Sequence, residues 1–131
     1  MEIYKVVVDD LITKSSTNLI VEVDEGETTE DIIIKAVVLG QEIVVSNYNY
    51  LPAYQEFRDR LLQLGLGIKC NGSRINAVQS GMMGANEKMY LVEIGKQARR
   101  ENIVHIWDYA EIDTFPDTKQ QSAFFEQWIK L

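Results

Sequence analysis

The sequence holds little cysteine, little proline and no long hydrophobic run, and each shortage excludes a class of protein. Its 131 residues contain one cysteine and two prolines. A single cysteine cannot form an internal disulfide, which favours a reducing cytoplasm. The apolar run Ala36–Leu39 is far shorter than the roughly 18 residues of a membrane span. The N-terminus, MEIYKVVVDD, lacks the basic segment of a signal peptide. We therefore expect a cytoplasmic protein that does not associate with membranes.

Basic residues are scarce at the start of the chain, and this scarcity accounts for the net charge of −7. Residues 1–31 hold nine acids and two lysines, so nine minus two gives the entire −7. The acids are Glu2, Asp9, Asp10, Glu22, Asp24, Glu25, Glu27, Glu30 and Asp31. Nucleic acids and anionic membranes require a basic patch, so neither is an expected partner. An acidic surface serves either solubility or the docking of a basic protein, for which Asp24, Glu25 and Glu27 are the candidate contacts.

Alternating apolar residues predict two strands near the N-terminus. Apolar content of 46% and charged content of 25% are typical of one globular domain, covering residues 1–131. Residues 2–9 alternate with period two, and so do residues 18–24. We expect these two strands to pair in antiparallel fashion across the polar loop between them.

Three further stretches carry helical spacing. A stripe at Ile33, Ala36, Val37, Gly40 and Val44, after Thr28 as N-cap, predicts a helix over 29–45. The β-branched run 32–34 would equally suit a strand. Residues 52–64, with proline in the first turn, predict a second helix.

The last helix is predicted over 118–130. Asp117 and Gln120 have the spacing of a capping box. An apolar face is expected to dock this helix; it consists of Phe124, Phe125, Trp128 and Leu131.

The stretch 64–96 contains six of the eight glycines and three of the four methionines. Asn71-Gly72 is a strong tight-turn signal and predicts a hairpin between strands 66–70 and 75–79. Residues 80–86 read as a loop and 88–94 as a strand. The apolar run 103–109 predicts a central strand buried on both faces. The expected fold is α+β: five or six strands in a mainly antiparallel sheet with three packed helices.

Few residues carry chemistry. Cys70 and His105 are the sole cysteine and histidine, and they would suit a nucleophile and its base if they met. Asp108, Glu111 and Asp113 could hold a hard cation with a substrate phosphate. The sequence contains neither a phosphate-binding glycine loop nor the spacing of a structural metal site. No cofactor and no resident metal are therefore expected.

A polar and methionine-rich cluster flanks the predicted hairpin. Loops on a rigid scaffold often bind partners, and methionines adapt to irregular surfaces. The same residues would also serve turn formation and core filling. The candidates are Asn71, Arg74, Gln79, Ser80, Met82 and Met83.

Three runs carry a resemblance: GIKCNGSRINAVQSGMMG, KMYLVEIGKQA and the closing FFEQWIKL. Together they resemble small uncharacterised cytoplasmic bacterial proteins, a group that includes proteins regarded as immunity proteins. The resemblance spans residues 64–131 and implies a protein that blocks a cognate toxin by binding it. It carries over no catalytic pattern and no functional residue.

Three hypotheses of function follow. The first is a non-enzymatic protein-binding module, such as an immunity protein that occludes a basic toxin with its acidic N-terminal third. The alternative is a small enzyme that uses Cys70 with His105, or the three carboxylates at 108, 111 and 113. The third is a structural or regulatory subunit, since the sequence leaves homo-oligomerisation open.

Overall fold

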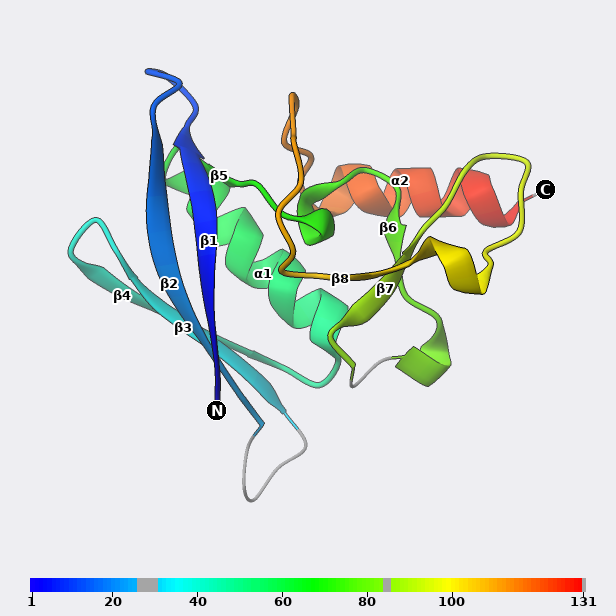
Figure 1. Cartoon of the computed structure of the whole chain (residues 1–131), viewed down its shortest axis with the longest axis horizontal. Helices are drawn as coiled ribbons and strands as arrows, with labels where there is room; N and C mark the ends of the chain where they lie inside the picture. The colour runs from blue at the N-terminus through cyan, green and yellow to red at the C-terminus, as the bar shows by residue number, and fades with distance from the viewer. Residues whose placement is uncertain (26–30, 84–85, 131) are drawn as a thin grey trace.

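Two antiparallel sheets and two α-helices make up the described part of the chain (Figure 1). The computed structural model describes residues 1–25, 31–83 and 86–130, apart from the side chain of Met82. The predicted α+β class is therefore confirmed. The predicted number of helices is wrong, because these ranges contain two α-helices instead of three.

The larger sheet has five strands in the order β4-β3-β2-β1-β5. The strands are β1 (Glu2–Asp10), β2 (Ser16–Glu25), β3 (Ile32–Val38), β4 (Gln41–Asn47) and β5 (Leu66–Ile68). The predicted antiparallel pairing of the first two is confirmed, with Tyr4 opposite Val21. Val6, Val8, Val21 and Val23 are buried, so alternation directs one face of the sheet to the core.

The predicted helix over 29–45 is wrong. Its described residues form the β3–β4 hairpin, in which Ile34 pairs with Val45 and Lys35 with Val44. Leu39 and Gly40, with φ of 51° and 76°, make a two-residue turn whose twist suits the hairpin. β-branched residues fill both strands and pack well on a pleated surface, whereas they lose side-chain freedom in a helix. The proposed N-cap, Thr28, lies outside the described residues.

Helix α1 (Tyr50–Gln63) covers the inner face of this sheet (Figure 1). The predicted helix over 52–64 is thus confirmed with its start two residues earlier. Tyr54, Phe57 and Leu61 are fully buried and form the core between helix and sheet. Gly65, with a φ of 80°, follows the end of α1 and turns the chain into β5.

The Asn71-Gly72 pair does not form a hairpin. It lies in a buried 3-10 turn, η1 (Asn71–Ser73). A Cβ on Gly72 would stand 2.7 Å from the Tyr54 ring and 2.9 Å from Ile106. The glycine is therefore needed for close packing, a use that its tight-turn signal does not reveal.

A smaller sheet follows, with strand order β6-β7-β8. Its strands are β6 (Ala77–Val78), β7 (Lys88–Leu91) and β8 (Ile103–His105), and 3-10 turns η2 (Gly81–Met83) and η3 (Arg100–Asn102) lie between them. The second strand of the expected hairpin pairs with β7 instead of β5. The strand predicted over 103–109 is confirmed only at 103–105, and its predicted central position is wrong, since β8 is a half-buried edge strand.

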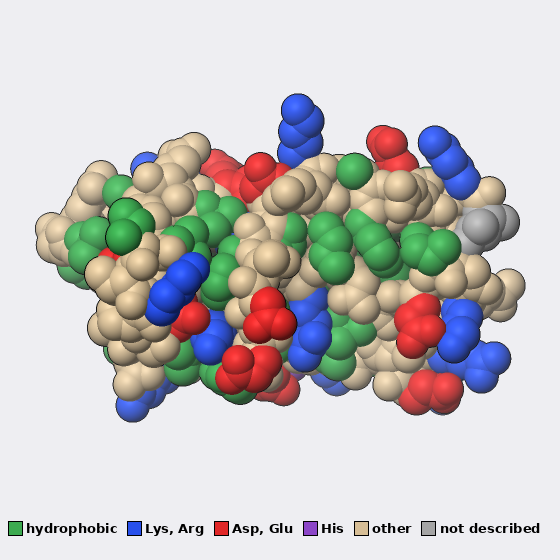
Figure 2. All heavy atoms as spheres, turned by 90° about the horizontal axis from the view of Figure 1, so that it is seen from above, with side chains coloured by type: hydrophobic (Ala, Val, Ile, Leu, Met, Phe, Trp, Pro, Cys, Tyr) green, Lys and Arg blue, Asp and Glu red, His purple; other side chains and the backbone are tan. Residues whose placement is uncertain are grey.

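Helix α2 (Thr118–Ile129) starts at the predicted capping box, in which Asp117 accepts from the Gln120 amide at 2.9 Å. Its predicted aromatic docking face is confirmed only in part: Phe124 and Trp128 are half-buried, whereas Phe125 is 37% exposed. Leu131 lies outside the described residues. Figure 2 accordingly shows a row of hydrophobic side chains on the surface over the half of the molecule that contains α2. Within the described ranges, neither helix is long and apolar enough to cross a bilayer.

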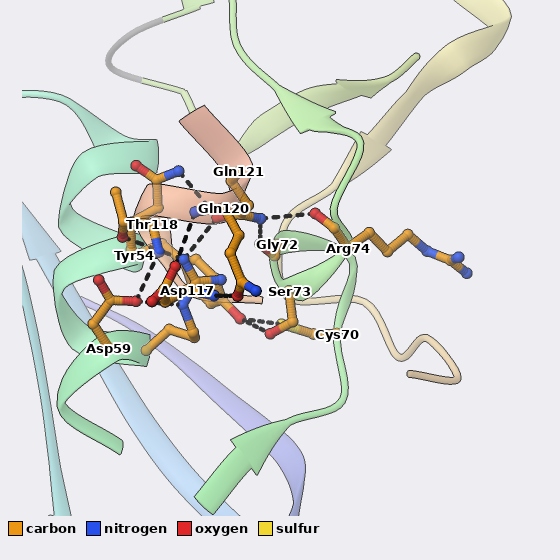
Figure 3. Close-up of polar contacts among 12 residues, drawn as sticks. Tyr54, Asp59, Cys70, Gly72, Ser73, Arg74, Asp117, Thr118, Gln120 and Gln121 are labelled. Carbon is orange, nitrogen blue, oxygen red and sulfur yellow. Dashed lines mark hydrogen bonds and ion pairs between the residues drawn. The ribbon is translucent and has the colours of Figure 1, made fainter. Parts of the chain in front are cut away.

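The buried residue of α2 is polar. Gln121 is 2% exposed, and its carboxamide makes four hydrogen bonds (Figure 3). The oxygen accepts from Arg58 at 2.6 Å and from Gln55 at 3.1 Å. The nitrogen donates to the carbonyls of Gly72 at 2.9 Å and Arg74 at 2.7 Å. All of its hydrogen-bonding capacity is used.

We expect Gln121→Ala to lower the free energy of unfolding by about 3 kcal/mol or more, because it leaves a buried guanidinium and two carbonyls short of partners. Urea denaturation at unchanged slope measures the loss. Ser122→Ala, at the exposed neighbouring position, is the control and should cost within about 0.5 kcal/mol. A loss no larger than that of the control would contradict the structural role assigned to Gln121.

Candidate functional site

A hollow of about 490 Å³ opens at one end of the larger sheet, and its rim is acidic. We call it the acidic hollow. It is lined by Met1, Glu2, Tyr4, Val23, Asp24, Glu25, Tyr50, Glu87 and His105. Four of these residues carry carboxylates, and none is lysine or arginine.

The pairing of the strands brings these residues together. Glu2, at the start of β1, pairs with Val23 near the end of β2, so the carboxylates at the two strand ends become neighbours. Tyr50 is the first residue of α1. The smaller sheet supplies the remaining side, because β7 follows Glu87 directly and its Lys88 pairs with His105.

Aromatic side chains form the wall of the acidic hollow. The Tyr4 ring stacks on Trp107, with centroids 5.5 Å apart and planes 18° apart, and lies 5.4 Å from His105. The Trp107 indole donates to the Tyr50 hydroxyl at 2.9 Å. His105 Nδ1 accepts from the Trp107 amide at 3.2 Å. The wall is thereby fixed to the core through Trp107, which is 4% exposed.

The environment keeps both tyrosines protonated. Burial raises the pKa of Tyr4, and the negative charge of Glu2 raises it further. Burial is also the main cause that raises the pKa of Tyr50, and the nearby Glu87 charge adds to it. A site with neutral phenols and ionised carboxylates favours a cation.

Part of this site follows from the sequence. Asp24 and Glu25, two of the three predicted acidic contacts, line the acidic hollow, while Glu27 lies outside the described residues. Sequence reasoning missed Tyr4, Tyr50 and Glu87 as members of the same site. The pairing of β1 with β2 could have indicated Glu2 and Tyr4, whereas nothing local connects Tyr50 or Glu87 to them.

Most of the polar cluster predicted around the glycine-rich segment is engaged in structure. Asn71 donates to the His105 carbonyl at 3.1 Å and accepts from Arg74 Nε at 3.2 Å. Gln79 accepts from the Leu51 amide at 3.1 Å and donates to the carbonyls of Asn86 at 2.6 Å and Lys88 at 2.8 Å. These amides hold neighbouring segments together.

Gln79 also borders a different surface, and Ser80 lies beside it there. Gln79 and the exposed Ser80 line a groove of about 260 Å³ between α1, β6 and α2, together with Phe125. Met83 is half-buried, and the Met82 side chain is outside the described part. The lining of this groove does not overlap that of the acidic hollow.

Cys70 and His105 do not form a nucleophile–base arrangement. The fully buried Cys70 thiol lies 3.1 Å from the Tyr54 hydroxyl, which also bonds to Ser73 (Figure 3). The His105 ring contacts Tyr4 and the Trp107 amide instead. Burial raises the pKa of Cys70 to about 11, which leaves the thiol protonated and unreactive at neutral pH.

The carboxylates of Asp108, Glu111 and Asp113 also do not form the predicted cation site. Glu111 accepts from Lys69 Nζ at 3.3 Å and from the Tyr109 hydroxyl. The Tyr109 hydrogen bond, followed by Lys69, lowers the pKa of Glu111. Across residues 1–25, 31–83 and 86–130, no group of three His, Cys, Asp or Glu side chains is placed to hold a metal ion.

Comparison with known proteins adds no family to this picture. No protein-family model matches the chain, and no curated protein matches its sequence.

We expect native Cys70 to resist a thiol reagent at pH 7 and to react fully in urea, because it is buried and protonated. Its folded pKa of about 11 exceeds the ordinary 9.0, so the protonated thiol is favoured in the folded state. The free energy of unfolding should therefore fall as pH rises between these two values, by at most about 1.4 kcal/mol per pH unit. Cys70→Ala should lack this component. Rapid labelling of the native protein at pH 7 would contradict the assignment.

Proposed function

We propose that this protein is a non-enzymatic binding protein whose acidic hollow receives a basic side chain of a partner protein. The observation that carries the proposal is the acidic hollow itself, about 490 Å³ in volume, with four acidic residues and no lysine or arginine in its lining. The inert environment of Cys70 and the absence of a metal-holding group among the described residues give no support to the enzymatic alternative.

The chemistry of the hollow favours an arginine or lysine as the group received. Carboxylates in the lining attract a cation, and the half-buried Tyr4 ring offers cation–π contact to it. An arginine has an additional advantage, since its planar guanidinium can stack on an aromatic ring while its N–H groups bind carboxylates. Complementary charge of this kind mainly increases the rate of association and the specificity.

A toxin of basic surface is the partner that suits this proposal best. An immunity protein acts by occupying its toxin, so it requires a complementary surface and no catalytic group. The acidic first 31 residues, which account for the entire net charge of −7, supply a field that would attract such a partner over a distance.

The test compares two variants with equal changes of charge. One neutralises the acidic hollow: Glu2→Gln, Asp24→Asn, Glu25→Gln and Glu87→Gln. The control neutralises four exposed acids elsewhere: Glu93→Gln, Glu101→Gln, Asp113→Asn and Glu126→Gln. Proteins captured by the wild type and the control, but not by the hollow variant, are the partners to be measured.

With a captured partner, we expect the hollow variant to associate roughly tenfold more slowly than the control at low salt, because steering by nearby charges is lost. Biolayer interferometry in a salt series measures the rates. The difference should vanish near 1 M salt, where the screening length is about 3 Å. Equal association of the two variants, or a partner with an acidic contact surface, would contradict the proposal.

A further inference from the structure

The outer face of the larger sheet carries hydrophobic side chains that no described element covers. Helix α1 packs on the inner face, which leaves the other side of β1–β4 to solvent. Ile3 is 59% exposed, Ile20 51%, Val37 63% and Val44 43%. Apolar side chains gathered on one face, rather than scattered singly, mark an interaction surface.

The charges at the centre of this face balance, unlike those of the whole chain. Its central residues include two lysines, Lys5 and Lys35, and two glutamates, Glu22 and Glu42. Lys35 and Glu22 pair at 3.8 Å. These central residues carry no net charge. They are therefore unsuited to a strongly basic partner, but they permit a second copy of a chain whose total charge is −7 to approach.

The register of the strands arranges these residues in two rows across the sheet. The first row runs from β1 to β4 through paired residues: Ile3, Glu22, Lys35 and Val44. The second row consists of two pairs, Lys5 with Ile20 and Val37 with Glu42. A hollow of about 380 Å³ lies between the two pairs, with Ile20 and Val37 on its sides.

We infer that this face binds a second copy of the chain, around a two-fold axis that runs parallel to the strands between β2 and β3. Such an axis sets β1 of one copy over β4 of the other and β2 over β3. In the first row, Glu22 then faces Lys35 of the second copy, and Ile3 faces Val44. In the second row, Lys5 faces Glu42, and Ile20 faces Val37. Within these two rows, every charge meets its opposite and every apolar residue meets another.

The alternative orientation lacks this match. A two-fold axis across the strands would exchange the two rows, so that Glu22 would face Ile20 and Lys35 would face Val37. Burying those charges against apolar side chains would be costly. The aligned arrangement is also the usual geometry of two sheets packed face to face, about 10 Å apart. The hollow between the two pairs leaves room for the long side chains of the second copy.

The edge of the sheet offers the second copy a poorer surface. Arg60 of α1 donates to the Val44 carbonyl on edge strand β4 at 3.1 Å. This bond takes up a carbonyl that pairing with another strand would require. Continuation of the sheet from edge to edge is therefore disfavoured, so the outer face is the better surface for a second copy.

The test is a pair of charge reversals designed to complement each other. In the Lys5→Glu variant, the introduced glutamate of each copy faces Glu42 of the other copy. In the Glu42→Lys variant, the introduced lysine of each copy faces Lys5 of the other copy. We expect either variant alone to raise the dimer dissociation constant roughly tenfold or more, since each reversal introduces two like-charge contacts. Sedimentation equilibrium should shift from twice the 15.0 kDa chain mass to the single chain mass.

An equimolar mixture of the two variants should regain the dimer. At one contact the two introduced side chains, a glutamate and a lysine, face each other, and at the other contact the native Lys5 faces the native Glu42. This recovery also shows that both variants are folded. Glu126→Lys, on α2, is the control and should leave the dimer intact. A wild type that stays at the single chain mass at all attainable concentrations would overturn the inference. A dimer insensitive to both reversals, or a mixture that remains monomeric, would overturn it as well.

Discussion

A buried guanidinium and the carboxamide that accepts a hydrogen bond from it hold the two halves of this fold together. Arg58 is fully buried and pairs with Asp59 at 2.8 Å and with Gln121 at 2.6 Å. A buried charge is tolerated only when it has such partners. Because the same carboxamide binds the carbonyls of Gly72 and Arg74, a single side chain of α2 fixes α1 and the turn that follows β5.

That turn also positions the acidic hollow. Gly72 packs against the Tyr54 ring, and its amide donates to the Ile106 carbonyl at 3.0 Å. The chain is thereby held in place immediately before Trp107, whose indole supports Tyr4 and binds Tyr50. The wall of the hollow thus depends on a chain of contacts that begins at Gln121. A substitution distant from the hollow can therefore alter its shape.

The sequence predicts some parts of this structure and not others. Period-two alternation identifies residues 2–9 and 18–24, because one face of each strand is buried. The stretch 29–45 fits two patterns. Ile33, Ala36, Val37 and Val44 have helical spacing, but the β-branched residues that fill this stretch also suit strands. Pairing with β2 selects the β3–β4 hairpin. Gln121 gives no signal at all, because its value depends on partners more than 45 positions away. The acidic hollow is predictable only for its strand-end carboxylates.

The two proposed surfaces use one sheet in different ways, and charge separates them. The acidic hollow lies at the strand ends and carries carboxylates without lysine or arginine, which is the basis for proposing a basic partner there rather than a second copy of an acidic chain. The two central rows of the outer face carry equal numbers of lysines and glutamates in opposed positions, which is the basis for proposing a second copy there. Lys5 and Glu42 do not line the hollow. A dimer formed through the outer face would therefore present two acidic hollows, and a bivalent partner would be bound more tightly by both than by either alone.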